Sequence, residues 1–453
     1  MIRSEPMVAF FATAEHTKPM LFWLVSPCDG APMLKPHDVF TPAKPPLEVN
    51  NVYAPRGQHE KDFVQALERS HVPVVFGEYG VGKTSMARHV LLDTDQAGRL
   101  VNIESAAGKS LADLFKVILE HLGYEVTKSL SQQDNNSSTL AGSAEAGAVF
   151  PGLTAKFTTS GSTSTARTTT SVRELAVASP TDSKILDLCE EAGLVLLVDE
   201  VHRADAGMVR DLSSFIKAAS NKPCKNFKVV LLGTASDATR LVDHDPGIDR
   251  IIQEISLPSL STAEATSIVL DGMARLAIEI SDGIVGRVVK LAVGSPALVQ
   301  YLALEIAEAA FPRDPRKASD SDLPQALKNY IRKRANRMDD AYLKAIETTG
   351  QRRYRKQILI AMGNIDAEYI TMDQLVTQVS KQLGESVPST ALSGPLRSLK
   401  TPEFGSILRD VERHEGGSRV FNYTAFSDPA MRAFIRMRYV GEEEGLLQAG
   451  EGT

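Results

Sequence analysis

Residues 77–84 read Gly-Glu-Tyr-Gly-Val-Gly-Lys-Thr, and this stretch decides the fold. It matches the pattern G-x-x-x-x-G-K-[ST], whose glycine-rich backbone curls so that successive N–H groups point at a bound phosphate. The apolar run 72–76 precedes it, and a helical-looking stretch, 85–92, follows it. A strand before the loop and a helix after it are the context that this pattern requires. The sequence therefore predicts a phosphate-binding loop that joins a buried strand to a helix.

The residue types in this loop have separate chemical tasks. The glycines allow the sharp backbone turns, and the helix that begins at Lys83 adds its positive N-terminal end. We expect Lys83 to neutralise the β- and γ-phosphates of ATP as a point charge, and the Thr84 hydroxyl to ligate Mg²⁺. The residues expected to contact the nucleotide are Gly77, Glu78, Tyr79, Gly80, Val81, Gly82, Lys83, Thr84, Ser85 and, from further upstream, Arg56.

Two carboxylates end a second apolar stretch. Residues 194–200 read Leu-Val-Leu-Leu-Val-Asp-Glu, which is typical of a strand buried in a parallel sheet. Open α/β sheets bind their ligands at the carboxyl ends of such strands. We expect Asp199 to hold Mg²⁺ through water, and Glu200 to act as the general base that activates the attacking water. The pair predicts an ATP hydrolase, a P-loop NTPase, rather than a site that only binds nucleotide.

Together with a later apolar run, these motifs resemble the core of the AAA+ ATPases. The later run, residues 229–235, reads Val-Val-Leu-Leu-Gly-Thr-Ala. The resemblance covers about residues 50–300 and implies an αβα sheet with a helical lid. In that family a polar residue at the tip of this later strand senses the γ-phosphate and positions water. Thr234 matches it by place.

The same resemblance singles out Arg250, which directly precedes the apolar run 251–255. AAA+ proteins usually place here an arginine that acts on the nucleotide of a neighbouring subunit. A guanidinium at this position would stabilise charge on the transferring phosphoryl group. The alternative is a surface ion pair with Asp249 or Glu254, because position alone supports the catalytic reading.

Two further segments refine the resemblance. Arg56, within 52–57, is similar to the pre-loop box of AAA+ initiator ATPases and of the related signal-transducing STAND ATPases, where it contacts nucleotide or closes the site. Initiator-type proteins also place a sensing arginine early in a lid helix, but residues 293–298 read Val-Gly-Ser-Pro-Ala-Leu. This Gly-x-Pro form looks more like the STAND group. No arginine matches the sensing position, and Arg287, one helix earlier, is a weak substitute for it.

Composition limits the remaining classes. A chain of 453 residues with 43% hydrophobic content is long enough for two or three domains with sizeable cores. Its net charge of −6 gives no global attraction to nucleic acid or to an anionic membrane, so any DNA contact must be local. Three cysteines, Cys28, Cys189 and Cys224, are far apart, which favours reduced thiols in a cytoplasmic protein and offers no metal-ligand spacing.

The expected fold class is α/β: a parallel-sheet P-loop AAA+ core with a helical lid and a C-terminal winged-helix domain. Charged residues and a proline interrupt the apolar runs of residues 7–26, so neither a membrane span nor a signal peptide is expected there. The expected divisions are an N-terminal extension packed on the ATPase core, 1–50; the nucleotide-binding domain, 51–258; a Ser/Thr-rich insertion, 128–172; the lid, 259–340; the winged helix, 341–440; and an acidic tail, 441–453.

The insertion allows two interpretations. Of the 18 residues from 155 to 172, 11 are Ser or Thr, and such low complexity favours disorder. Alternation of threonines also favours strands, so a two-stranded ribbon around 150–170 is the other interpretation. Lys156 and Arg167 would then lie on a hydroxyl-rich surface suited to phosphate oxygens.

The last hundred residues resemble a winged helix. Helices are expected to end near 358–362 and to span 372–383 and 389–399, the last capped by Ser389, and the glycines of 414–417 predict a hairpin turn. Such a module often puts its third helix in the major groove of DNA. The basic candidates are Arg397, Lys400, Arg413 and Arg419, and they are opposed by Glu403, Asp410, Glu412 and Glu415. Contact with duplex DNA and docking to a protein therefore remain alternatives.

Three functions from different classes follow. The first is an ATP-hydrolysing AAA+ switch that self-associates through its nucleotide sites and acts on DNA or a DNA-bound partner. The second is a STAND-like signalling ATPase, for instance in phage defence, whose winged helix docks an unknown protein effector. The third, a small-molecule kinase, fits poorly with the Asp-Glu strand end and the large helical C-terminal half.

Overall fold

The computed structural model describes residues 34–94, 99–123, 181–222, 224–233, 246–347, 354–365, 367, 369–414 and 420–447. Residues 35–453 form one compact unit. The Ser/Thr-rich insertion lies outside the described residues, as do Cys28 and Thr234.

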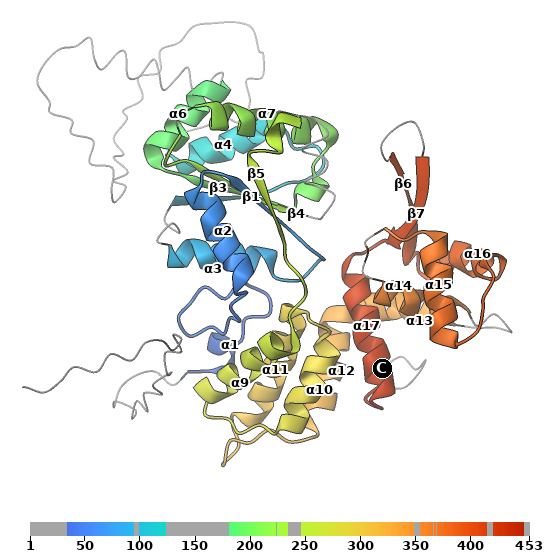
Figure 1. Ribbon diagram of the computed structural model, residues 1–453. Coiled ribbons are helices and arrows are strands. Elements are labelled where there is room, and N and C mark those ends of the chain that lie inside the picture. The colour runs from blue at the N-terminus through green and yellow to red at the C-terminus, as the bar shows by residue number, and fades with distance from the viewer. Residues whose placement is uncertain are drawn as a thin grey trace, which may run out of the picture. The chain divides into compact units, whose positions relative to one another are not determined.

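A five-stranded parallel sheet forms the centre of the nucleotide-binding part (Figure 1). Its strands are β1 (Val72–Phe76), β2 (Leu100–Glu104), β3 (Val195–Asp199), β4 (Lys228–Gly233) and β5 (Ile252–Ser256), in the order β2-β3-β4-β1-β5. The central strands are mostly apolar, apart from Lys228 at the start of β4 and Asp199 at the end of β3, because helices cover both faces of the sheet. The register pairs Val74 with both Leu231 and Glu254, so β1 lies between β4 and β5. The prediction of a parallel α/β core is thus confirmed.

Helices pack on the two faces as separate layers, and each layer has its own apolar core (Figure 1). On one face lie α4 (Leu111–His121), α6 (Asp182–Ala192) and α7 (Ala206–Asn221), whose core includes the rings of Phe115 and Phe215, tilted by 57° with centroids 5.2 Å apart. On the other lie α2 (Gln58–Glu68) and α3 (Lys83–Asp93). A capping box begins α4, because the Ser110 hydroxyl accepts a hydrogen bond from the Asp113 N–H and the Asp113 carboxylate accepts one from the Ser110 N–H. The two layers fix the sheet, and with it the strand ends that carry the expected site.

The lid is an all-helical layer that follows β5. Its helices are α9 (Thr262–Arg275), α10 (Asp282–Ala292), α11 (Pro296–Ala310) and α12 (Asp322–Tyr330). A π-helical turn at Ile331–Ala335 then leads to α13 (Asn336–Ile346), which lies beside the C-terminal part (Figure 1). The described part of the N-terminal extension packs on this lid rather than on the ATPase core as the sequence suggested. Phe40, just after α1 (Pro36–Val39), lies against Gly272 of α9, and the Gln300 side chain of α11 accepts a hydrogen bond from the Thr41 N–H. Absence of a Cβ at Gly272 makes room for the Phe40 ring.

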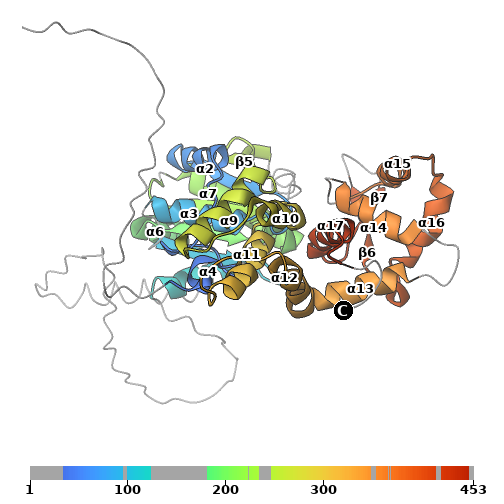
Figure 2. The same ribbon diagram turned by 90° about the horizontal axis from the view of Figure 1, so that it is seen from below.

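The C-terminal part contains three helices, a hairpin and a last helix (Figure 1, Figure 2). These are α14 (Tyr354–Asn364), α15 (Met372–Leu383), α16 (Ser389–Ser398), the antiparallel pair β6 (Leu408–His414) and β7 (Val420–Phe426), and α17 (Ala430–Glu443). Ile370, between α14 and α15, forms a β-bridge with Thr424 of β7. Each of the three expected helices and the hairpin is present within a few residues of its expected bounds.

Two local expectations for this part are wrong. Pro388, not Ser389, is the N-cap of α16, and it provides no side-chain cap. The chain from Gly441 onward does not begin as an exposed acidic tail, because α17 runs to Glu443. Glu442 is buried and accepts a hydrogen bond from Lys356, and Glu444 pairs with Lys290 of α10. The expected tail therefore begins within a helix that packs on α10 of the lid, and its carboxylates pair with lysines far away in the sequence.

None of the helices in the described part of the chain combines the length and the apolar character that crossing a membrane requires.

Candidate functional site

The phosphate-loop residues lie at the carboxyl end of β1 and turn directly into α3. Gly82 is the N-cap of α3 and has a φ of 94°, a left-handed conformation that glycine adopts without a steric penalty. Lys83 and Thr84 are therefore the first two helical residues, where N–H groups have no intrahelical partner. These N–H groups and the positive helix end suit an anionic ligand. Val81 is buried, and Tyr79 is 57% exposed.

Gly77, the first residue of the loop, is required for space. A Cβ on Gly77 would lie 2.3 Å from the carbonyl oxygen of Leu257 and 3.2 Å from Cγ2 of Val81. Leu257 belongs to the segment between β5 and the lid, and its N–H donates to the Phe76 carbonyl. The loop is thus packed tightly against the chain that leads to the lid.

We expect Gly77→Ala to lower the free energy of unfolding by about 1–3 kcal/mol, the usual effect of overpacking. Gly207→Ala is the matched control, because a Cβ at Gly207, within α7, meets nothing within 4 Å. The control should be neutral or stabilising by up to about 1 kcal/mol. Urea unfolding of both variants measures the difference, and equal stabilities would contradict the close approach.

The Lys83 side chain is folded back onto its own loop. Its Nζ donates to the carbonyl oxygens of Gly77 at 3.0 Å and Glu78 at 2.9 Å. These contacts hold the ammonium group at the mouth of the loop. Binding of phosphate oxygens would require the ammonium group to exchange these carbonyl acceptors for them.

Thr84 and the Asp-Glu pair meet at the sheet edge. The Thr84 hydroxyl donates to Oδ2 of Asp199 at 2.7 Å, and the N–H of Glu200 donates to Oδ1 at 2.8 Å. These two hydrogen bonds fix the orientation of the Asp199 carboxylate, and Asp199 is only 7% exposed. A hydroxyl and a carboxylate within contact distance are oxygen ligands of the type that Mg²⁺ prefers. Among the described residues, no group of three or more His, Cys, Asp or Glu side chains is arranged to hold a metal ion.

Glu200 leaves the strand in a left-handed conformation, with a φ of 57°. This φ is uncommon for a residue with a side chain, and such residues often lie at functional sites. Its carboxylate contacts Nε2 of His202 at 3.2 Å. The sequence reading missed His202, although its position two residues after the acid, in the short turn Val201–Arg203, was a usable signal.

Arg56 ties together three segments. Its side chain is 4% exposed, donates to the carbonyl oxygens of Val81 in the loop and Pro258 before the lid, and pairs with Glu264 of α9 at 3.3 Å. Arginine keeps its charge when buried and offers five N–H donors, which suits it to join several acceptors. Glu264 also forms the capping box of α9 with Ser261, so the lid begins at this cluster.

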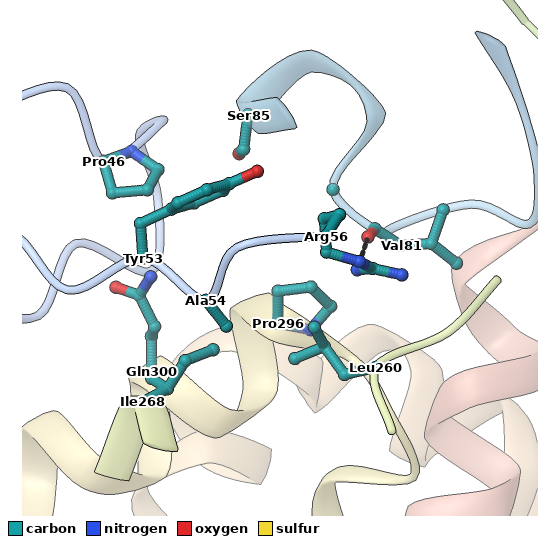
Figure 3. Close-up of a pocket in the computed structure, with 11 residues that line it drawn as sticks. Pro46, Tyr53, Ala54, Arg56, Val81, Ser85, Leu260, Ile268, Pro296 and Gln300 are labelled. Carbon is teal, nitrogen blue, oxygen red and sulfur yellow. Dashed lines mark hydrogen bonds between the residues drawn. The ribbon is translucent and has the colours of Figure 1, made fainter. Parts of the chain in front are cut away.

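A hollow beside this cluster is lined by loop, lid and upstream residues (Figure 3). Tyr53 lies between Pro46 and the start of α3, where Ser85 is found, and Pro296 and Gln300 come from α11. The Tyr53 ring stacks on His89 with centroids 3.9 Å apart. Burial, with a hydrogen bond to Glu60, raises the pKa of Tyr53 well above its usual value, so the phenol stays neutral.

The space in this hollow is small. Its volume of about 30 Å³ equals the share of one water molecule in the liquid. A planar base could enter only if the upstream segment and the lid moved apart, because these two elements form most of its walls. The hollow therefore marks where the lid and the loop meet in this conformation.

Comparison with known proteins decides the family of the nucleotide-binding part. Residues 66–242, which include the loop and the Asp-Glu strand end, match the family model described as an AAA domain. The chain carries an AAA-type P-loop ATPase domain. No curated protein matches the chain.

Solved structures with a similar chain course include three archaeal proteins. The Walker-type ATPase of Pyrococcus abyssi is 14% identical, with 87% of this chain and 98% of that chain covered at a TM-score of 0.45. Cdc6p of Pyrobaculum aerophilum is 15% identical, with 86% and 96% covered at 0.41. ORC1 of Aeropyrum pernix in complex with DNA is 12% identical, with 87% and 95% covered at 0.41. At these identities and TM-scores the similarity does not assign a role to any residue of this chain.

With the P-loop and the acidic strand end in place, the AAA domain makes the chain an ATP-hydrolysing enzyme. Arg250 is exposed directly before β5, and among the described residues it forms no ion pair with Asp249 or Glu254. Arg287, the substitute for a lid sensor, is instead paired with Asp320 at 2.7 Å.

Outside the AAA domain, the two expected DNA-contacting residues have different environments. Arg397 is exposed on α16. Lys400 is 19% exposed and pairs with Asp410 of β6. The side chain of Arg413 and the whole of Arg419 lie outside the described part.

Proposed function

We propose that this ATPase is a nucleotide-driven switch that self-associates through its ATP sites and acts on duplex DNA through its C-terminal part. The observation that carries the DNA half of the proposal is the exposed face of α16. Its exposed residues are Ser389, Thr390, Ser393, Gly394 and Arg397. Small hydroxyl-bearing residues permit close approach to a phosphate backbone, and no residue of α16 carries a carboxylate that would repel it.

The arrangement around α16 supports a winged-helix role for 341–440. Three helices precede an antiparallel hairpin, and the bridge between Ile370 and Thr424 attaches the helices to that hairpin. In such modules the third helix enters the major groove of DNA. The third helix of this part is α16. The short sheet would set the angle at which α16 faces the duplex.

For hydrolysis, each side chain at the sheet edge has a proposed role. Lys83 would leave its loop carbonyls to hold the β- and γ-phosphate oxygens, and Thr84 and Asp199 would be the residues that hold Mg²⁺. The bound ion supplies charge neutralisation at the phosphates. Glu200 accepts the proton of the attacking water, and Thr234, which directly follows β4 in the sequence, positions that water. Arg250 of a neighbouring copy stabilises the charge that develops on the γ-phosphate.

The DNA proposal is tested by Arg397→Ala. Loss of one phosphate contact should weaken duplex binding and reduce the slope of log affinity against log salt by about 0.9. Lys400→Ala should have a smaller effect, because its ammonium group is already paired with Asp410. Binding is measured by anisotropy with ATP present at several salt concentrations.

Lys328→Ala serves as the matched control, because Lys328 is exposed on α12, away from α16. It should leave both the affinity and the slope unchanged. If the wild-type protein shows no salt-dependent DNA binding with ATP present, the signalling ATPase is the better function. The pairing of Lys400 with Asp410 and the net charge of −6 favour that second function, with the C-terminal part docking a protein effector.

A further inference from the structure

The P-loop residue Glu78 is held from the far end of the chain. Nη1 of Arg432 lies 2.5 Å from one oxygen of its carboxylate, and Nη1 of Arg436 lies 3.2 Å from the other. The two arginines are four residues apart and so lie on one face of α17. Their side chains are 9% and 16% exposed, and that of Glu78 is 27% exposed. Two cations thus share one carboxylate in a largely dry contact.

Each arginine is also fixed by the C-terminal part. Arg432 donates to the Ala367 carbonyl and Arg436 to the Gly363 carbonyl, both at the end of α14. A guanidinium has enough donors to serve both partners and stays charged at any physiological pH. The pair therefore connects the end of α14 to the phosphate loop, and α17 also pairs with the lid through Glu444 and Lys290.

Glu78 takes part in a second contact, through its backbone. Its carbonyl oxygen accepts the hydrogen bond from Nζ of Lys83 at 2.9 Å. One residue thus links the C-terminal arginines, through its side chain, to the phosphate-binding lysine, through its carbonyl. Phosphate binding requires Lys83 to leave this carbonyl and the loop N–H groups to face the ligand.

We propose that Arg432 and Arg436 are positioning residues of the ATP site. They hold the phosphate loop in the conformation in which Lys83 donates to the loop carbonyls, and they release the loop when nucleotide binds. We call the ion pairs of Glu78 with Arg432 and Arg436 the Glu78 contact. This contact lowers the affinity for nucleotide, and bound nucleotide weakens the contact. Because linkage is reciprocal, ATP must loosen the contact by the same factor by which the contact weakens ATP binding. The inference rests on nucleotide binding at the loop and not on DNA binding by α16.

The test is a double-mutant cycle on ATP affinity with Glu78→Gln and Arg432→Gln in the full chain. Each single variant should tighten ATP binding by about fivefold or more, the lower end of usual coupling between sites. The double variant should gain little beyond either single variant, because both remove the same interaction. Affinity is measured by calorimetry with a non-hydrolysable ATP analogue and Mg²⁺, without DNA.

Reciprocity gives a second readout that a merely structural role would not move. In the wild-type protein the analogue should speed hydrogen exchange in residues 430–443, and in Glu78→Gln exchange there should be fast with or without it. Arg337→Gln is the matched control, since Arg337 forms an exposed ion pair with Asp428, just before α17. It should change neither affinity nor exchange.

Several results would overturn the proposal. Unchanged or weaker ATP binding by Glu78→Gln, with native circular dichroism, would mean that the contact does not oppose nucleotide. Additive effects in the cycle would mean that the two residues act separately. Absence of ATP binding by the wild-type protein would contradict both the ATP site and this inference. Absence of DNA binding would contradict only the proposed DNA function.

Discussion

Lys83→Ala should abolish measurable ATP binding, whereas Glu200→Gln should bind ATP normally and lose about 10²–10⁴-fold in turnover. The first side chain carries charge that offsets the phosphates in the bound ground state. The second acts only on the attacking water, so its effect is confined to the transition state. Equilibrium binding of a fluorescent ATP analogue, together with steady-state phosphate release, separates the two effects.

The controls for this pair must avoid the loop. Glu78→Gln is unsuitable because Arg432 and Arg436 hold its carboxylate. Lys61→Ala and Glu68→Gln match the two charge changes at exposed positions of α2 and should leave binding and turnover unchanged. Equal loss of ATP affinity in the Lys83 and Glu200 variants would contradict the division of roles.

Arg250→Ala should lower turnover by about 10³-fold or more while leaving the ATP affinity of an isolated subunit nearly unchanged. This is the result expected if the guanidinium completes the site of a neighbouring copy. Its exposure before β5, without an ion pair to Asp249 or Glu254 among the described residues, leaves it available for that contact. The measurement is phosphate release as a function of protein concentration.

Mixing experiments decide whether this arginine acts between subunits. Arg250→Ala protein mixed with Lys83→Ala protein should recover part of the activity, because one supplies an intact nucleotide site and the other an intact arginine. Arg203→Ala, also on the AAA domain, is a charge-matched comparison in the same mixing assay. Wild-type turnover by Arg250→Ala alone would instead indicate a self-contained site.

Local pattern was sufficient to predict the core of the fold. The apolar runs at 72–76 and 194–198 favoured buried strands, because they are short, contain no charged residue and end at turn or charged residues. The loop at 77–84 fixed the strand-to-helix connection and the helix start at Lys83. The confirmed AAA assignment rests on these stretches, whose information is contained within a few consecutive residues.

The contacts that shape the site could not be predicted in this way, since they join residues far apart in the sequence. Arg56 is paired with Glu264, and Glu78 with Arg432, and nothing in the neighbouring sequence of any of them indicates its partner. Charged residues on an amphipathic helix have many acceptable partners, and only packing selects one. For the same reason the sequence indicated four carboxylates near the basic residues of this part but not that Asp410 would pair with Lys400.

The buried position of Arg56 has a consequence for how the lid can move. Its guanidinium cannot lose its proton, and it is shielded from water while its partners come from the loop, the segment before the lid, and α9. A rotation of the lid that carried Glu264 away would leave an unpaired cation in a dry environment, which is unfavourable unless another anion takes its place. Opening of the lid that separates Glu264 from Arg56 is therefore disfavoured. A hinge motion at Pro258 would instead keep Arg56 in contact with Glu264 while the rest of the lid rotates.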